Sequence, residues 1–118
     1  MHVEEFRDYC LSKKGATESF PFDESTLVFK VMNKMFALCS LEKQPTFANL
    51  KCDPERAIAL REAHDGKITP GYHMNKQLWN SVVLEGVPKK LVLELIDHSY
   101  QLIVQSLTKK LQAELAAL

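Results

Sequence analysis

The segment 70–76, followed by Trp79, holds the densest group of side chains with the chemistry to contact a ligand. It reads Pro-Gly-Tyr-His-Met-Asn-Lys, so an imidazole, an amide and an ammonium follow two turn-forming residues. Lys76 can pair with a phosphate, Asn75 can hydrogen-bond a base edge, and Trp79 can stack on a base. With His73 as a further donor, this loop is predicted to bind an anion or a nucleobase. The alternative is a plain turn, with Trp79 in the core and Lys76 in solvent, and the sequence leaves both interpretations open.

Three lysines, Lys30, Lys34 and Lys51, lie on stretches that alternate like neighbouring β-strands. Side by side on a sheet they would form a basic stripe that contacts phosphates, and such binding falls steeply with salt. Lysines at sheet edges also discourage pairing with other sheets, which is a common role. That second role is favoured for any single lysine, and for the group the question stays open.

No residue pattern in the chain predicts catalysis, a metal centre or a cofactor. The candidate metal ligands are Cys39, Cys52, His64 and His73, and their spacing fits no zinc motif. Cys52 and His73 are conceivable as nucleophile and base, but only their residue types suggest it, and a buried thiol is the simpler interpretation. The sequence has no phosphate-binding loop, dinucleotide-binding motif or nucleophile elbow. We therefore expect a protein that is not an enzyme and has no catalytic residues, metal or cofactor.

The length and composition of the chain indicate one small protein. The chain has 118 residues, enough for a single core, so we expect one domain over residues 1–118. No apolar run approaches the roughly 20 residues of a membrane helix, and the start of the chain lacks the order of a signal peptide. Three widely spaced cysteines without a CxxC pair predict buried thiols in a reducing compartment. We expect a cytoplasmic protein with no membrane partner.

The charges balance over the whole chain but not along it. Fifteen basic and fifteen acidic residues give a net charge of zero, which argues against a strongly basic nucleic-acid binder. Residues 1–24 hold three basic and six acidic side chains (−3), residues 25–90 ten and six (+4), and residues 91–118 two and three (−1). The middle of the chain can therefore present a positive face, although an ordinary mixed surface is slightly favoured.

Two periodicities divide the chain into helices and strands. Helical spacing predicts helices over 3–13, from Asp53-Pro54 to about 63 or 64, from Pro88 to about 106, and after Thr108. Alternation predicts strands over 17–20, 26–32, 35–41, 46–51 and 78–85, with a tight turn at Asn33-Lys34 and an irregular or short extended stretch over 67–76. Short connections favour an antiparallel β-sheet packed by helices on one face, an α+β fold.

The long helix after Pro88 carries a stripe that we expect to be buried. Its members recur at helical spacing: Val92, Leu95, Ile96, Ser99, Leu102 and Ile103. A hydroxyl on such a stripe can bond back to a carbonyl one turn earlier in the helix, and we expect this of Ser99.

Several strings together resemble the MmcQ/YjbR family of small bacterial proteins. The resemblance extends from residue 3 to about 107 and is most specific at 70–76 followed by Trp79. The other strings are Phe20-Pro21-Phe22, Val28-Phe29-Lys30-Val31, Lys34-Met35-Phe36-Ala37-Leu38, Leu50-Lys51-Cys52-Asp53-Pro54-Glu55, Leu60-Arg61, Leu78-Trp79-Asn80 and Ser99-Tyr100. One departure is Asn33, where a glycine is common in the first hairpin turn, but asparagine still tolerates a left-handed conformation.

The resemblance implies an antiparallel α+β fold similar to secretion chaperones and to the frataxin-like CyaY shape. It also implies the label of a DNA-binding protein, from a double-wing arrangement in which two hairpin loops flank the nucleic acid. We place these wings around Asn33-Lys34 and at residues 66–77. The family has no agreed catalytic residues, so none are carried over.

The leading hypothesis is weak and largely sequence-independent binding of nucleic acid, with DNA as the partner. The proposed contacts are Lys30, Lys34, Lys51 and Lys76 to phosphates, and His73, Asn75 and Trp79 for hydrogen bonds or stacking. The first alternative is a protein-interaction or chaperone-like module, in which an exposed sheet edge or face takes up a peptide or another copy of the chain. The second alternative is a small-molecule site around His73 and Trp79.

Overall fold

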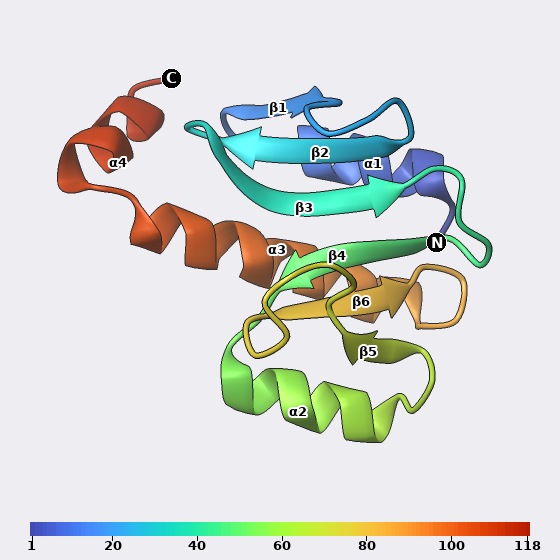
Figure 1. Cartoon of the computed structure of the whole chain (residues 1–118). Coiled ribbons are helices and arrows are strands. Elements are labelled where there is room, and N and C mark those ends of the chain that lie inside the picture. The colour runs from blue at the N-terminus through green and yellow to red at the C-terminus, as the bar shows by residue number, and fades with distance from the viewer.

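The computed structural model describes all 118 residues, and it joins a six-stranded sheet to four helices (Figure 1). The helices are α1 (Val3–Leu11), α2 (Pro54–Ala63), α3 (Lys89–Ser106) and α4 (Lys109–Ala116). The strands are β1 (Ala16–Ser19), β2 (Thr26–Val31), β3 (Lys34–Ser40), β4 (Phe47–Lys51), β5 (Ile68–Pro70) and β6 (Trp79–Val83). They lie in the order β1-β2-β3-β4-β6-β5, and every neighbouring pair is antiparallel. The predicted α+β fold is therefore confirmed.

Alternation along the strands gives the sheet two different faces. In β2, Leu27, Phe29 and Val31 belong to the core cluster. Successive side chains of a strand point to opposite faces, so Val28 and Lys30 face away from that core. The same alternation holds in β4 and β6, where Ala48, Leu50 and Val82 belong to the core cluster, and Phe47 lies on the open face.

A bulge in β3 changes which of its residues face the core. Phe29 pairs with Ala37, but Lys30 pairs with Met35, so Phe36 is an extra residue on β3. Phe36 and Ala37 are both fully buried in the core cluster. Met35 consequently shares the opposite face with Leu38, and both side chains line a groove there.

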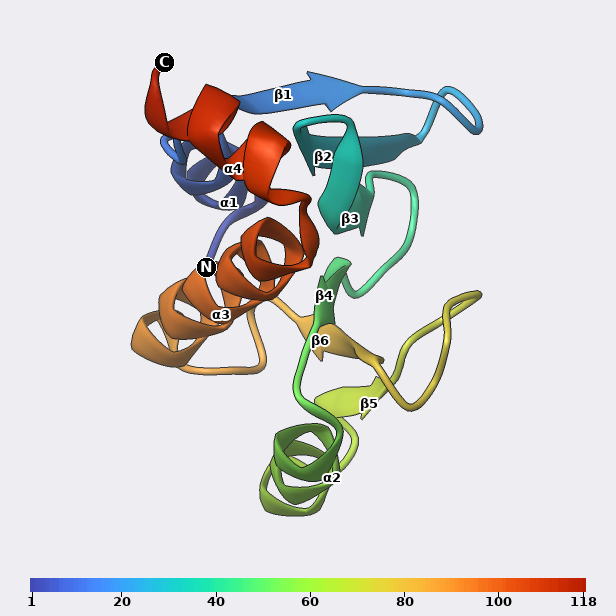
Figure 2. The same cartoon turned by 90° about the vertical axis from the view of Figure 1, so that its left-hand side faces the viewer.

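Helices α1, α3 and α4 lie on one side of the sheet, and no helix covers the other side (Figure 2). Helix α3 packs against β2, β3 and β4 and buries Val92, Leu95, Ile96 and Ile103 in the core. Helix α2 lies beside β5 at the edge of the sheet (Figure 1). We call the uncovered side of the sheet the open face.

Two polar residues fix α3 against the rest of the domain. The hydroxyl of Ser99 donates to the main-chain oxygen of Phe36 and accepts from the main-chain N–H of Lys51 at 2.9 Å. The prediction that Ser99 bonds to a carbonyl within its own helix is therefore wrong. The bulge in β3 and the end of β4 present main-chain groups that need partners, and Ser99 supplies them. The hydroxyl of Tyr100 donates to the main-chain oxygen of Lys14, and Tyr100 rather than Leu102 completes the buried stripe.

The first hairpin turn lies one residue earlier than predicted. Met32 and Asn33 have φ values of 47° and 68°, and β3 begins at Lys34. A two-residue hairpin loop of this kind needs positive φ at both central positions. Asn33 therefore takes the second of these positions and Met32 the first, in place of the predicted pair Asn33-Lys34.

The three cysteines are free and buried, as predicted. Burial raises the pKa of Cys39 to about 12, so its thiol stays protonated and unreactive at neutral pH. No three His, Cys, Asp or Glu side chains gather where they could hold a metal ion. None of the four helices combines the length and apolar character of a membrane span.

Candidate binding groove on the open face

Two loops project from the open face, one at residues 20–25 between β1 and β2 and one at 71–78 between β5 and β6 (Figure 2). Together with the connection between β3 and β4, they enclose a groove of about 690 Å³. Its apolar lining consists of Phe22, Met35, Leu38, Phe47, Tyr72 and Met74. The volume falls in the range of small-ligand pockets, about 300–1,000 Å³. We call this hollow the groove.

Tyr72 is held against the sheet by two main-chain hydrogen bonds. Its N–H donates to the hydroxyl of Ser81 at 2.9 Å, and its carbonyl accepts from the amide of Asn49 at 3.1 Å. The Ser81 hydroxyl in turn donates to the Asn49 carbonyl oxygen. Asn49 and Ser81 are buried, so these bonds satisfy polar groups that water cannot reach. The Tyr72 ring packs edge-on against Phe47 and remains 47 % exposed, as a fixed wall of the groove.

Gly71 allows the 71–78 loop to approach β6 closely. A Cβ at this position would lie 2.8 Å from the Cβ of Trp79 and 3.0 Å from its main-chain oxygen, to which the Gly71 N–H donates. No side chain fits at that distance. Trp79 is only 8 % exposed, so it packs inside the protein, as in the alternative raised from the sequence. It supports the loop and does not offer a ring surface to a ligand.

Asn75 and Lys76 shape the far end of the same loop. The side-chain oxygen of Asn75 accepts from the main-chain N–H groups of Gln77 and Leu78, which is an Asx turn. The guanidinium of Arg61 in α2 donates to the main-chain oxygen of Lys76. Lys76 itself is exposed, and its ammonium reaches back to the Gly71 carbonyl at 3.3 Å. The loop is therefore tied at both ends, and its residues 72–74 line the groove between the ties.

His73 lies at the tip of this loop in a left-handed conformation, with φ of 59°. This conformation is uncommon for any residue other than glycine, and histidine is among those that tolerate it better. Its ring is exposed, and its centroid lies 4.1 Å from that of Tyr72. The imidazole is thus free to donate to a ligand in the groove.

The charged groups that line the groove differ in whether they already have a partner in the protein. The carboxylate of Asp23 accepts from the main-chain N–H groups of Ser25 and Thr26, and these bonds hold the pKa of Asp23 below its ordinary value. Lys43 places its Nζ 5.5 Å from the centre of the Tyr72 ring. It forms no ion pair, whereas Asp23 is occupied in shaping its own loop. Glu42 is exposed beside Lys43 and also lines the groove.

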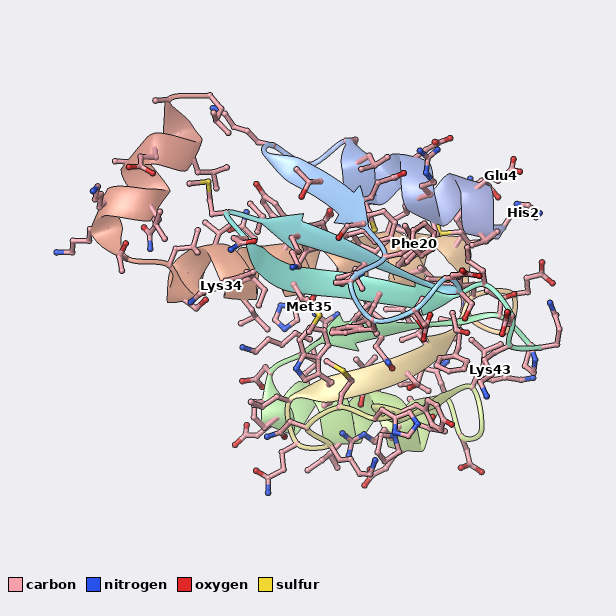
Figure 3. The ribbon with its side chains drawn as sticks, turned by 45° about the horizontal axis from the view of Figure 1, so that its top comes forward. His2, Glu4, Phe20, Lys34, Met35 and Lys43 are labelled. Carbon is pink, nitrogen blue, oxygen red and sulfur yellow. The ribbon has the colours of Figure 1, made fainter.

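The lysines predicted to contact phosphates do not share one face of the sheet. Lys34 pairs with Val31, which belongs to the core, so its side chain lies on the helix side. Lys30 lies on the same face of β2 as Val28, and Lys51 on the same face of β4 as Asn49. Figure 3 shows Lys34 and Lys43 at opposite ends of the sheet. None of these lysines takes part in an ion pair, since the four pairs of the protein are Arg7–Glu18, Lys13–Asp97, Arg56–Glu94 and Lys89–Glu5.

Of the seven residues predicted as a site, only His73 lines the groove. Asn75 and Lys76 lie on the projecting loop, Trp79 lies beneath it, and the other three are the lysines of the sheet. Lining residues that were not predicted include Phe22, Met35, Lys43 and Tyr72. Signals existed for Phe22 and Tyr72, because each is an aromatic residue next to a turn former. Met35 gave no signal, since simple alternation without the bulge would place it in the core.

The fold and its two projecting loops define a class of small α+β proteins with one uncovered sheet face. A family model described as YjbR matches residues 11–102. The chain is 33 % identical to the protein YjbR of Escherichia coli (strain K12) over 111 residues, which is 93 % of each chain. It is 38 % identical to the protein YbdF of Escherichia coli O157:H7 over 92 residues, 77 % of this chain and 75 % of that protein. The chain belongs to the YjbR family, as its sequence strings indicated.

Solved structures agree with this assignment. A crystal structure of the Deinococcus radiodurans protein DR2400, with a domain named DUF419, is 43 % identical and superposes with a TM-score of 0.90, covering 97 % of this chain and 87 % of that one. A crystal structure of a Pseudomonas syringae protein is 30 % identical with a TM-score of 0.75, covering 86 % and 98 %. The names of these relatives state no activity, ligand or partner.

Proposed function

We propose that the open face binds single-stranded nucleic acid, weakly and with little sequence preference. The observation that carries the proposal is a set of exposed aromatic rings on the two projecting loops. Phe20, Phe22 and Tyr72 are 48 %, 65 % and 47 % exposed, although residues of these types are usually packed away from water. Exposed rings beside a basic sheet face are the arrangement on which unstacked bases bind, because every base has a face to stack.

Unpaired positive charge supports this proposal. Lysines on the open face or the loops around it are not neutralised by ion pairs, namely Lys30, Lys43, Lys51 and Lys76. Asp23 and Glu42 line the groove as well, and their negative charge opposes a phosphate backbone. We therefore expect modest affinity with a clear dependence on salt.

The rings favour a single strand over a duplex, because the bases of a duplex are already stacked on one another. The two flanking loops of our proposal are 20–25 and 71–78. The second overlaps the 66–77 wing predicted from the sequence. The first replaces the turn at Asn33-Lys34, because that turn lies in the plane of the sheet, whereas residues 20–25 project from the open face (Figure 2).

The test is fluorescence anisotropy with a labelled deoxyoligonucleotide, single-stranded and as a duplex, over a series of salt concentrations. The double variant Lys43→Glu/Lys76→Glu changes two exposed lysines beside the open face. It should weaken single-strand binding and flatten its salt dependence by about 0.7 in log–log slope for each phosphate that is no longer neutralised. The matched control is Lys109→Glu/Lys110→Glu, which makes the same charge change on exposed residues of α4. Equal effects of the two double variants, or no binding by the unaltered protein at low salt, would refute the proposal.

An amide-shift titration of labelled protein with the same oligonucleotide locates the contact surface. Shifts confined to residues 20–25, 30–36, 42–51 and 71–78 are expected. Shifts centred on α1 and α3 would place binding on the wrong side of the sheet.

A protein-interaction role is the second candidate, and one observation favours it. Strand β1 is an outer strand of the sheet, so a peptide strand could pair with the side that faces away from β2. Met35 and Met74 in the groove are adaptable side chains of the kind used by surfaces that bind varied peptides. Co-purification of a defined protein partner, with no nucleic acid retained at low salt, would favour this candidate. In both candidates the protein is proposed to bind and not to catalyse.

A further inference from the structure

We propose that the groove holds one nucleotide unit of the bound strand, with the base inside and the phosphate at the rim beside Lys43 and His73. This inference rests on the proposed binding of single-stranded nucleic acid and adds a defined position for one base. The names of the relatives assign no ligand to this hollow.

The apolar lining suits a flat aromatic ring. Phe22 on one loop and Tyr72 on the other form facing walls, and Met35 and Leu38 of β3 contribute the floor. Aromatic rings prefer edge-on or offset contacts with other rings, and methionine sulfur packs favourably against ring edges. A volume of about 690 Å³ exceeds what a single side chain would fill, so the hollow is large enough for a whole nucleotide.

Contacts within the protein itself hold both walls of the groove in position. Tyr72 is fixed by Ser81 and Asn49 through its own main chain, and its ring is braced by Phe47. The 20–25 loop is fixed by the carboxylate of Asp23, which accepts two main-chain N–H groups. Preformed walls lower the entropy that a ligand loses on binding.

The polar groups at the rim match the remaining parts of a nucleotide. Lys43 carries a positive charge with no ion-pair partner, and the His73 ring is exposed next to Tyr72, so both can donate to a phosphate. The carboxylate of Glu42 and the hydroxyl of Ser40 can accept from a sugar hydroxyl or an exocyclic amine. The carboxylate of a simple aromatic acid could pair with Lys43, but such a ligand offers no donor to Glu42. Its negative charge would also repel the Glu42 carboxylate. The combination therefore points to a nucleotide.

The variant Ser40→Phe tests the inference by filling the groove. Ser40 lines the hollow at the end of β3 and lies outside the core cluster, so the fold should tolerate the change. The control is Gln101→Phe, which adds the same ring at an exposed position on α3, away from the open face. Urea unfolding of both variants checks that each retains the native fold.

The first probe is AMP, with binding followed by amide shifts at millimolar concentration. We expect shifts at residues 22–26, 35–43 and 72–74, an affinity at least about tenfold weaker for Ser40→Phe, and no change for Gln101→Phe. Phenylacetate is the second probe and represents a plain aromatic acid. Equal affinity for phenylacetate and AMP would overturn the nucleotide assignment, and so would unchanged AMP binding in Ser40→Phe.

Measuring oligonucleotide binding by Ser40→Phe separates this inference from the proposed function. Oligonucleotide binding that is unchanged in Ser40→Phe would leave the proposed function standing and remove the groove from it. AMP binding in the groove without any oligonucleotide binding would uphold the nucleotide site and refute the single-strand function. Loss of both ligands in Ser40→Phe, with native stability, is the result that supports the two together.

Discussion

The side-chain amide of Asn49 in β4 donates a hydrogen bond to the main-chain oxygen of Tyr72, 23 residues further along the chain. Because the Asn49 carbonyl oxygen also accepts from Ser81, one buried side chain connects two strands to the loop that forms a wall of the groove. The position of the Tyr72 ring therefore depends on a buried polar side chain at the base of the groove.

Asn49→Ala should lower the free energy of unfolding by about 1–3 kcal/mol, since it leaves the Ser81 hydroxyl and the Tyr72 carbonyl without their buried partner. It should also weaken oligonucleotide binding, because Tyr72 loses its fixed position. Urea unfolding and anisotropy measure the two effects. Ser81→Ala and the double variant complete a mutant cycle, in which the destabilisation of the double variant should be smaller than the sum of the two single effects. Strict additivity would show that the two side chains do not act as a unit.

Phe22→Ala should reduce binding of a single-stranded oligonucleotide by about 1–3 kcal/mol, the usual contribution of one stacked base. Its side chain is 65 % exposed, so the stability of the fold should change by less than about 0.5 kcal/mol. Ile58→Ala is the matched control, because Ile58 is 54 % exposed on α2, which lies at the edge of the sheet away from the 20–25 loop. An equal reduction of affinity in both variants would mean that Phe22 has no specific role.

The helices and strands followed from the sequence because local signals mark them. The sequence placed helix starts at Asp53 and after Thr108, and the side chains of both residues accept main-chain N–H groups at the starts of α2 and α4. It placed a strand over 78–85, and in β6 Val82 lies in the core whereas Ser81 lies on the other face. These signals depend on neighbours a few residues apart, so they can be read directly from the chain.

The groove was harder to predict because it depends on contacts between distant segments. The bulge at Phe36 decides that Met35 faces the groove, and it shows only in the pairing of β2 with β3. From the sequence, Trp79 was a candidate to stack on a base. In the structure it is buried, because the loop approaches closely at Gly71. Residue types suggested a binding loop at 70–76 and a loop projects there, but which of its side chains face outward is set by buried polar residues of β4 and β6.

Gly71→Ala should destabilise the protein by about 1–3 kcal/mol, because the added methyl group would overlap Trp79 and force the loop away from β6. Gly66→Ala is the comparison, since nothing lies within 4 Å of a Cβ there and the only penalty is its φ of +76°, worth about 1–2 kcal/mol. Asparagine tolerates positive φ, so Gly66→Asn should recover most of that stability, whereas Gly71→Asn should not. Trp79 fluorescence should change only in the Gly71 variants. A change of the same size in the Gly66 variants would contradict the steric explanation.

His98 should make the stability of the fold depend on pH. Its Nε2 accepts from the main-chain N–H of Asp53, the residue that caps α2, and this needs a neutral ring. Burial, and then the positive charge of Arg56, lower the pKa of His98, whereas the nearby carboxylates of Asp53 and Glu94 act in the opposite direction. The unfolded chain therefore takes up a proton at a higher pH than the folded protein does.

Stability contributed by neutral His98 should accordingly be complete above the ordinary histidine pKa and should decline as the pH falls from there toward the lowered value. His98→Gln keeps a side-chain acceptor for the Asp53 N–H but cannot titrate. Urea midpoints measured between about pH 7.5 and pH 5 should fall more steeply for the unaltered protein than for this variant. The other three histidines are present in both proteins, so the difference between the two curves isolates His98. Parallel curves would show that protonation of His98 is not linked to folding.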